Sequence, residues 1–588
     1  MIGEIKRLGF QKNPDTSVWV LPEKKNFTYS DGEKVENYIL HSIQKSKDRS
    51  TFSSELKGYI KDWPSLYHLS NRRANILKPF ANILQGKTVL EIGCGCGALS
   101  RFLGEIGATL ISVEGSYRRS QIARERCKDL ENVEVVCGTS EDITKLKNFD
   151  FVILNGVLEY STMFLGEDGP SQLLKSCHNQ LKENGALILA IENRLGLKYL
   201  SGQNEDHAGK PMYGINDSYD RGEFKTWGRH ELLSLISISG FKETQEYIPL
   251  PDYKLPVSIV TPYGWKNFQE ELMMLAIDSV SEDPQRKSED SFSLEMGYKN
   301  TWSNGLALEL SNSFLMVAQK GDPKLVVSSN TLAYNYLDYY GKNSITSIES
   351  KSSSIIEKKY SLEDVFLTKP LESKNYLTGR NYWLELVRIL NKPNWDIQII
   401  SEWAKVWKNA VIECCKIPKD SKPDLRLNSR FVDAVPCNLY FDTNGIFQFK
   451  LIDNESRGNE VFFGSVIYFG LLISFSKIST VEYSNSTYNL SFAEILLKIF
   501  LDLFQDSEAI KTIESDWKVF FESEEEYTML KKKYFSQRNS ILNYKNRIDE
   551  LERNLNQIYQ SFGWRIATPI RFFFTLFKKT FQLIYRKR

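Results

Sequence analysis

The sequence predicts an α/β fold with a parallel sheet for the first half of the chain, followed by a second, α+β unit. Residues 1 to about 265 alternate short apolar runs with helical stretches, as strand–helix units do. Within this zone the strand-like run Thr88–Ile92 leads into a glycine-rich turn and then into a helix from about Ala98. Residues 279–300 are polar and predict a linker, so we expect the second unit over residues 301–520.

The glycine-rich turn, Gly93-Cys94-Gly95-Cys96-Gly97, predicts a ligand site. Glycines let a ligand approach the backbone, and the N-terminus of the next helix favours anionic or polar groups. The next strand ends at Glu114, an acid that can accept hydrogen bonds from both hydroxyls of a ribose. Three interpretations are open at this point: a nicotinamide enzyme with the fingerprint Gly93-x-Gly95-x-x-Ala98, an S-adenosylmethionine site with Glu91 before the turn, or a tight turn without a ligand.

Four segments, in order along the chain, carry a family resemblance. They are VLEIGCGCGALSRFLGE, SVEGS, FDFVILNGVLEY and LKENGALILAIEN. Together they resemble the motifs of class I S-adenosylmethionine-dependent methyltransferases, in the order and spacing of that family. The resemblance implies a Rossmann-like domain over residues 1–265 with S-adenosylmethionine as its cofactor. The residues that it assigns to cofactor binding are Glu91, Gly93, Gly95, Gly97, Glu114, Glu141, Asp142 and Asn155.

Flanking segments narrow this resemblance. DWPSLYHLSNRRANIL lies before the glycine turn, and IENRLGLKYLSGQNEDH, TWGRHELLSLISISGF and PLPDYKLP lie after it. They are similar to a subgroup of these enzymes that acts in bacterial surface-polysaccharide (O-antigen or capsule) pathways. The resemblance implies transfer of a methyl group to an oxygen of a sugar, on a glycan acceptor that is lipid-linked. It does not fix which sugar is methylated.

Methylation of a neutral hydroxyl needs a general base beside it and alignment with the sulfonium methyl group. His207 follows the fifth strand in the polar stretch Glu205-Asp206-His207 and is the first candidate base, with Asp206 or Glu205 to orient it. His68 is the second candidate. The competing interpretations are a loop histidine without a role for His207 and a structural hydrogen bond for His68. Two residues after the fourth strand are expected to shape the acceptor pocket: Glu159 and Tyr160.

The second unit contains RFVDAVPCNLYFDTNGIFQFKLIDNE, whose DTNG turn predicts a β-hairpin. The segment resembles the catalytic end of the protein-kinase-like fold. By that resemblance Asp433 acts on the attacking hydroxyl, and Asn438 and Asp453 hold Mg²⁺. Lys358 then pairs with the phosphates of ATP. The segment lacks HRD and DFG, and no convincing GxGxxG loop precedes it, so an inactive binding domain and an ordinary hairpin between buried strands are the alternatives.

Residues 521–560 predict a coiled coil, because apolar residues recur at steps of three and four with one break at Gln537. A coiled coil would make the protein a homo-oligomer, and a single long helix packed on its own domain is the alternative. The apolar seam consists of Tyr527, Leu530, Tyr534, Ile541, Tyr544, Ile548, Leu551, Leu555 and Ile558.

Residues 561–588 predict an amphipathic tail. Between Thr568 and Arg588 six basic residues and no acid lie opposite a face of isoleucine and phenylalanine residues. This pattern favours a helix on the anionic inner-membrane surface, with a partner protein such as a glycosyltransferase as the alternative. The segment SFGWRIATPIR also resembles the tail of several polysaccharide-assembly enzymes.

Composition excludes several other classes. The chain has 588 residues, 41% of them apolar and 25% charged, which excludes a disordered polyampholyte. Its 75 basic and 74 acidic residues nearly cancel, so we expect no nucleic-acid partner. Eight cysteines without a CxxC pair and five scattered histidines predict reduced thiols and no zinc site. Residues 1–10 lack an apolar signal segment, so we expect a cytoplasmic protein that associates peripherally with the membrane.

The order of these parts resembles bifunctional enzymes that cap O-antigen chains. The resemblance implies a sugar O-methyltransferase that also has kinase activity. Two alternatives keep the same parts: a methyltransferase whose kinase-like domain only binds, and an assembly protein whose C-terminal region recruits glycosyltransferases to the membrane.

Overall fold

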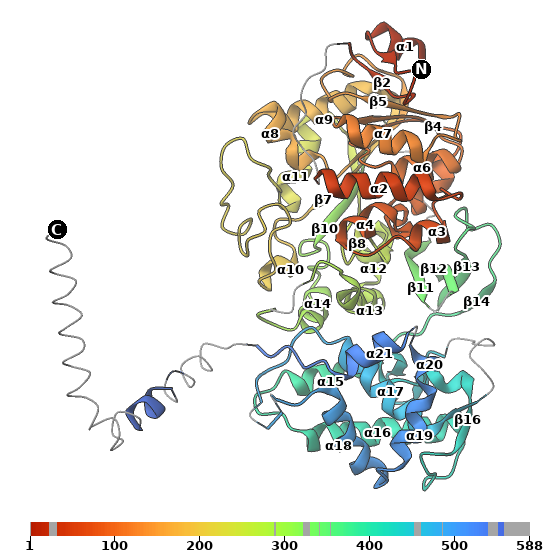
Figure 1. Ribbon diagram of the computed structural model, residues 1–588, viewed down its shortest axis with the longest axis vertical. Coiled ribbons are helices and arrows are strands. Elements are labelled where there is room, and N and C mark those ends of the chain that lie inside the picture. The colour runs from red at the N-terminus through yellow and green to blue at the C-terminus, as the bar shows by residue number, and fades with distance from the viewer. Residues whose placement is uncertain are drawn as a thin grey trace, which may run out of the picture.

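The computed structural model describes residues 2–22, 32–286, 290–321, 330–339, 342–352, 354–451, 460–484, 486–487, 489–521, 523–538, 548 and 551–557. Figure 1 shows two bodies stacked along the long axis of the molecule. The first contains a large sheet and the N-terminal helices, and the second is mainly helical. We call the second body, residues 380–538, the helical lobe.

Five parallel strands form the centre of the first body and confirm the predicted α/β fold. They lie in the order β5-β4-β3-β6-β7. Their apolar residues are buried on both faces, as in strands that helices cover on both sides. The strands and the helices between them are β3 (Thr88–Ile92), α6 (Ala98–Glu105), β4 (Thr109–Glu114), α7 (Tyr117–Arg126), β5 (Val133–Cys137), β6 (Phe149–Asn155), α8 (Ser161–Leu165), α9 (Gly169–Gln180) and β7 (Leu181–Glu192).

The residues before β3 form short elements around this sheet. β2 pairs parallel with β5 and extends the sheet at that edge, and α2 packs against α7. A buried ion pair between Arg119 of α7 and Glu36 of α2, at 3.0 Å, fixes that contact. The elements are α1 (Ile2–Arg7), β1 (Gln11–Lys12), β2 (Trp19–Val20), α2 (Glu33–Lys45), α3 (Ser54–Lys57), α4 (Trp63–Leu69) and α5 (Ala81–Leu84).

A strand from beyond the predicted linker enters the centre of the sheet and moves the domain boundary. β10 (Ser313–Gln319) lies antiparallel between β7 and β8 (Glu243–Leu250). All of its residues are buried, so the first body extends past residue 319 and does not end at residue 265. Much of the predicted linker at 279–300 is also ordered, since α13 (Gln269–Ser279) and α14 (Leu294–Ser303) pack against each other.

Truncation tests the placement of β10. A chain that ends at residue 300 leaves the facing edges of β7 and β8 without hydrogen-bond partners in the middle of the sheet. We expect that chain to lose cooperative thermal unfolding and to aggregate, whereas a chain that ends at residue 538 melts cooperatively. Circular dichroism melting of both chains measures this, and native-like melting of the shorter chain would contradict a central role for β10.

Beyond β8 the described strands continue as an antiparallel meander and bring the sheet to 14 strands. β9 pairs with both β8 and β11, so the meander and the parallel strands form one sheet. The remaining elements of the first body are α10 (Leu197–Leu200), α11 (Arg229–Ile238), β9 (Ser258–Val260), α12 (Pro262–Asn267), β11 (Thr331–Tyr339), β12 (Lys342–Lys351), β13 (Ser354–Ser361) and β14 (Glu372–Asn375).

The helical lobe packs around α17 (Phe463–Ser476), which is almost entirely buried, and its apolar core is continuous with that of the first body. No helix within the described ranges is long and apolar enough to cross a membrane. The predicted DTNG hairpin is present, with β17 (Leu439–Phe441) and β18 (Phe447–Phe449) on either side of the turn. The other elements are β15 (Arg380–Asn381), α15 (Trp383–Leu390), α16 (Ile397–Cys415), β16 (Arg426–Asn428), β19 (Glu460–Phe462), α18 (Phe492–Phe504), α19 (Ala509–Ile513), α20 (Trp517–Phe520) and α21 (Glu524–Lys531).

The start of the predicted coiled coil belongs to the helical lobe instead. Tyr527 of α21 is buried against Phe469 of α17, and its hydroxyl donates to Oε1 of Glu514 at 2.7 Å. An aromatic residue on the seam can pack on its own domain as readily as on a second helix, which is the alternative that the pattern allowed. Residues 551–557 are helical, with Leu551 and Leu555 exposed. Ile548 is exposed as well. Three other residues of the seam, Ile541, Tyr544 and Ile558, and the tail, residues 561–588, lie outside the described residues.

Candidate active site

A cavity of about 480 Å³ opens at the carboxyl ends of β3, β4, β6 and β7. In sheets of this kind, ligands bind outside the carboxyl ends of the parallel strands. Five of the residues predicted to contact a cofactor line this cavity: Gly93, Gly95, Glu114, Glu141 and Asn155.

The glycine turn presents its backbone to the cavity. Gly93 has a φ of +77°, and a Cβ atom there would lie 2.3 Å from Cγ2 of Val157, so only glycine fits. The amides of Gly93 and Cys94 donate to the carbonyl oxygen of Val113 at 2.8 and 3.1 Å. These bonds tie the turn to β4 and hold it beside the cavity.

Glu114 supports the turn from the end of β4. Its Oε2 accepts a hydrogen bond from the amide of Gly95, and its Oε1 accepts one from the amide of Ser116, both at 2.9 Å. Burial raises the pKa of Glu114, although Arg119 and these two amides oppose that shift. Because each carboxylate oxygen has a second lone pair, Glu114 can still accept a hydrogen bond from a ligand in the cavity that it lines.

Glu91 does not take the position predicted for it. Its carboxylate is buried under the turn, where Oε2 accepts hydrogen bonds from the hydroxyls of Ser100 and Ser112 at 2.5 and 2.9 Å. Burial raises its pKa, and these two hydroxyls oppose the shift. Glu91 therefore joins β3, β4 and α6, and it supports the turn rather than forming the wall of the cavity.

Gly97 and Asp142 do not line the cavity, and their contacts are with other parts of the protein. A Cβ atom at Gly97 would lie 2.8 Å from Cα of Ala123, so this glycine permits the close approach of α6 to α7. Oδ2 of Asp142 accepts hydrogen bonds from the amide and the hydroxyl of Thr139, at 2.8 and 2.9 Å. Both residues fix the backbone next to the cavity.

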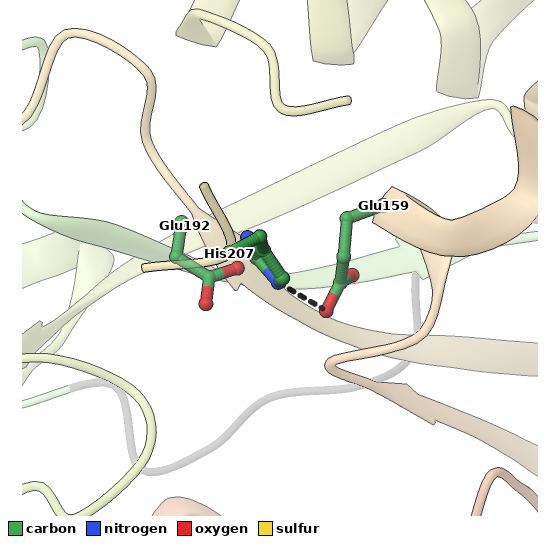
Figure 2. Close-up of side chains that lie close together, drawn as sticks. All are labelled: Glu159, Glu192 and His207. Carbon is green, nitrogen blue, oxygen red and sulfur yellow. Dashed lines mark ion pairs between the residues drawn. The ribbon is translucent and has the colours of Figure 1, made fainter. Parts of the chain in front are cut away.

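Glu159, Glu192 and His207 converge in the same cavity, and we call them the acidic cluster (Figure 2). One donor atom from each residue lies within 4.8 Å of the others. Nε2 of His207 is 3.9 Å from Oε1 of Glu159. Glu159 follows β6, Glu192 is the last residue of β7, and His207 lies in the loop between α10 and α11, so three separate segments build the cluster.

His207 is held in one orientation by its surroundings. Its Nδ1 lies 2.9 Å from Oε1 of Glu205, and Oε2 of the same carboxylate accepts a hydrogen bond from the His207 amide at 2.8 Å. The ring stacks on Phe224 at 5.0 Å and meets the edge of Tyr160 at 5.3 Å. Glu205 is thus the orienting acid, and Nε2 is the ring nitrogen that faces Glu159.

The two carboxylates of the acidic cluster are deeply buried, each with 1% exposure. Oε1 of Glu192 accepts hydrogen bonds from the hydroxyl of Tyr253 at 3.1 Å and from Nζ of Lys254 at 2.5 Å. Among the described residues, Oε2 of Glu192 and Oε2 of Glu159 have no hydrogen-bond partner.

Burial and mutual repulsion shift the protonation of the acidic cluster. Burial, together with the charge of Glu192, raises the pKa of Glu159 to about 8, while His207 opposes the shift. Burial alone would lower the pKa of His207, but Glu192, Glu205 and Glu159 outweigh it and raise that pKa to about 9. This part of the cavity therefore favours the binding of protons and cations.

Asp206 does not orient His207, contrary to one of the two predictions for that role. Its carboxylate binds Nζ of Lys198 at 3.2 Å and Nζ of Lys254 at 2.8 Å. Burial alone would raise the pKa of Asp206, but these two lysines hold it well below its usual range. His68, the second candidate base, lines the same cavity from α4 and packs edge-on to Tyr67.

Three important residues of the cavity were absent from the predicted set: Glu192, Tyr253 and Lys254. Glu192 could have been found, because it ends a parallel strand at the edge where ligands bind. Tyr253 and Lys254 lie in the loop after β8 and reach the cavity because this loop folds back toward it. No local sequence pattern indicates that fold of the loop.

The helical lobe brings two of its predicted residues together. Nδ2 of Asn438 donates to the backbone oxygen of Asp433 at 3.0 Å. Asp453 lies outside the described residues. Lys358 is on β13 of the first body, where its Nζ binds Glu349 at 2.7 Å.

The orientation of Lys358 does not fit the role predicted for it. Glu357, its neighbour on β13, reaches Lys450 beside the lobe hairpin at 3.3 Å. Because consecutive strand residues point to opposite faces, Lys358 points away from that hairpin.

Comparison with known proteins bears on the first body alone. Residues 90–189 match the family model of a methyltransferase domain, Methyltransf_11. The ubiquinone biosynthesis O-methyltransferase of Glaesserella parasuis is 30% identical over 146 residues, which is 24% of this chain and 59% of that protein. The enzyme of the same name from Bradyrhizobium diazoefficiens is 31% identical over 138 residues, which is 23% of this chain and 50% of that protein. The chain thus spans little more than half the length of these curated relatives.

Solved structures give a weaker likeness. Phosphoethanolamine N-methyltransferase 2 of Haemonchus contortus, in complex with S-adenosyl-L-methionine, is 17% identical and is matched over 43% of this chain and 53% of that chain, with a TM-score of 0.26. At this TM-score the likeness supports no conclusion about the function of this chain.

Proposed function

Since the chain carries a class I S-adenosylmethionine-dependent methyltransferase domain, we propose that it transfers a methyl group from S-adenosylmethionine to a hydroxyl oxygen of an acceptor. The observation that carries this proposal is one cavity that holds both the glycine turn with Glu114 and the acidic cluster. The curated relatives named above are O-methyltransferases, which supports oxygen as the atom methylated.

The residues of the cavity fit S-adenosylmethionine. Gly93 leaves room where any side chain would collide with Val157, so the backbone can approach a ligand. Glu114 is fixed by two amides and is placed to accept hydrogen bonds from ribose hydroxyls. When bound, S-adenosylmethionine supplies the methyl group on a sulfonium, and the electrons of the broken C–S bond stay on sulfur.

The acidic cluster would serve the acceptor. In our proposal the acceptor oxygen lies beside the cluster, forms the new bond to the methyl carbon with a lone pair, and releases its proton to a base of the cluster. His207, oriented by Glu205, and Glu159 are the groups within reach of each other for this task. Each can accept the proton once it is deprotonated, at a pH near its raised pKa of about 9 for His207 and about 8 for Glu159. Fixing the acceptor in line with the methyl group is the other contribution that the cavity makes.

Our proposal for the acceptor class starts from the resemblance of residues 50–258 to surface-polysaccharide enzymes. We propose a sugar of a lipid-linked glycan, since several buried polar side chains in one cavity suit a ligand with many hydroxyls.

Two further proposals start from the sequence. The first is that the tail docks on the inner membrane and that the exposed part of the heptad seam pairs two or more chains. The second is a nucleotide- or acceptor-binding role for the helical lobe. The Asn438–Asp433 hydrogen bond supports the second proposal, and the orientation of Lys358 opposes phosphate transfer.

Replacing Glu114 by alanine tests the cofactor site. A hydrogen bond to a charged group contributes about 1.5–3 kcal/mol, so we expect the affinity for S-adenosylhomocysteine to fall roughly 10–100-fold. Isothermal titration calorimetry measures the affinity. Glu134→Ala is the matched control, because Glu134 lies on β5 and pairs with Lys12 and Trp19 outside the cavity. A wild-type protein that does not bind S-adenosylhomocysteine would overturn the proposed function.

A further inference from the structure

We infer that the acidic cluster, Glu159, Glu192 and His207, binds a divalent transition-metal ion, Mn²⁺ or Zn²⁺, inside the cavity. Two carboxylates and one imidazole form a donor set that suits these ions, because carboxylates favour Mn²⁺ and imidazole favours Zn²⁺. The presence of the site does not depend on the proposed function, but its role does, since the ion would deepen the account of how the acceptor is bound.

The spacing of the three donors is close to that of a metal site. Their donor atoms lie within 4.8 Å of one another. Neighbouring ligand atoms of a tetrahedral ion bound at about 2.0–2.2 Å lie roughly 3.3–3.6 Å apart. Side-chain rotations that move the donor atoms by about 1 Å would therefore close the site. Figure 2 shows the carboxylates of Glu159 and Glu192 on either side of His207.

The histidine is already prepared as a ligand. Metal-bound histidines commonly donate their other ring N–H to a carboxylate, which fixes the tautomer and aims the free nitrogen at the metal. Glu205 takes that role here, with its Oε1 at 2.9 Å from Nδ1 of His207. The nitrogen left for a metal is Nε2, the one that faces Glu159.

Unpartnered oxygens point to a missing positive group. In the part of the chain that the structure describes, Oε2 of Glu159 and Oε2 of Glu192 are buried without a hydrogen bond, although both side chains are almost completely enclosed. A buried carboxylate oxygen without a partner costs about 1–3 kcal/mol or more. Lys254 satisfies Oε1 of Glu192 and leaves the second oxygen of that carboxylate free for a cation.

Counted as ionised, the acids around the acidic cluster outnumber the basic groups. The side chains that contact the cluster or one another include five acids and two lysines: Glu159, Glu192, Glu205, Asp206 and Asp252, with Lys198 and Lys254. Buried charge of one sign needs compensation by protons or by bound cations. A divalent ion between Glu159 and Glu192 would neutralise the part of this charge that the lysines leave.

The position of the ion assigns it a role. Catalytic metals keep three protein ligands and leave further positions for substrate oxygen. Those positions would face the cavity, where the ion would lower the pKa of a bound acceptor hydroxyl. With Nε2 of His207 on the metal, the proton would go to water instead of to that ring. The ion would then orient the acceptor oxygen for the methyl group.

Two variants with opposite expected effects on metal and cofactor binding test this inference on the full-length protein. After treatment with a chelator and its removal, the protein is titrated with Mn²⁺ and followed by electron paramagnetic resonance, and in parallel with S-adenosylhomocysteine by calorimetry. We expect one Mn²⁺ per chain, displaced by Zn²⁺. Glu192→Gln should weaken Mn²⁺ at least about tenfold and leave S-adenosylhomocysteine within about twofold. Glu114→Ala should show the opposite pattern, and this also proves that each variant is folded.

Several outcomes overturn the inference while sparing the proposed function. Wild-type protein that binds S-adenosylhomocysteine but neither Mn²⁺ nor Zn²⁺ has no metal site. Mn²⁺ binding that survives both Glu159→Gln and Glu192→Gln lies elsewhere. If metal does not bind and S-adenosylmethionine binds more tightly than S-adenosylhomocysteine, the negative charge of the acidic cluster stabilises the sulfonium of the cofactor and not a metal ion. If Mn²⁺ binds as expected but S-adenosylhomocysteine does not bind, the metal site stands and the proposed function is overturned.

Discussion

Replacing His207 by alanine is expected to lower methyl transfer by roughly 10²–10⁴-fold, the contribution of a positioned proton-transfer group. The variant should bind S-adenosylhomocysteine as the wild type does, because His207 contacts Glu205, Glu159 and aromatic rings rather than the glycine turn. Radiolabelled methyl transfer from S-adenosylmethionine to a polysaccharide fraction from cells that lack this protein measures the rate.

His178→Ala provides the control for this prediction. His178 lies on α9, packs against Phe241 and does not line the cavity among the described residues, so its loss should leave the rate within a few-fold. A His207→Ala variant as active as this control would show that the acidic cluster takes no part in the reaction.

Asp206→Ala should destabilise the protein by about 3–5 kcal/mol, the cost of breaking a buried ion pair by removing one partner. Asp206 and Lys198 are only 9% and 5% exposed, and Lys254 depends on the same carboxylate. Without Asp206, Lys198 keeps its ion pair with Asp252, and Lys254 keeps those with Asp252 and Glu192. Chemical denaturation followed by tryptophan fluorescence measures the free energy of unfolding.

An exposed ion pair supplies the comparison. Glu385 pairs with Arg388 on the surface of α15, with side chains 31% and 49% exposed. Its replacement by alanine should cost less than about 1 kcal/mol. Equal effects of Asp206→Ala and Glu385→Ala would show that the buried lysine network contributes no more to stability than a surface pair.

Local patterns predicted the parallel sheet well. The run Thr88–Ile92 coincides with β3, and the helix expected from about Ala98 follows the glycine turn as α6. The place of β10 could not be predicted in this way, because its neighbours β7 and β8 lie far away in the sequence. An apolar run indicates that a strand is buried and says nothing about which strands it joins.

The same distinction separates the predicted and unpredicted parts of the site. Gly93 and Glu114 were predictable because a strand, a turn and an acid follow one another along the chain. Asp206 and His207 are adjacent in sequence and yet point to different partners, Lys198 and Glu205 respectively. The path of the loop backbone determines which partners such neighbouring residues contact, and this path cannot be read from the spacing of residues in the sequence.

The position of β10 also determines when this protein can complete its fold during synthesis. β7 and β8 are made first, and the strand that joins them follows only after residues 251–312. At ribosomal rates of about 5–20 residues per second, this interval lasts roughly 3–12 s, during which two apolar strand edges stand open on a nascent chain. We therefore expect the yield of folded protein in a cell to depend strongly on chaperones at the ribosome exit, even if the finished protein is stable.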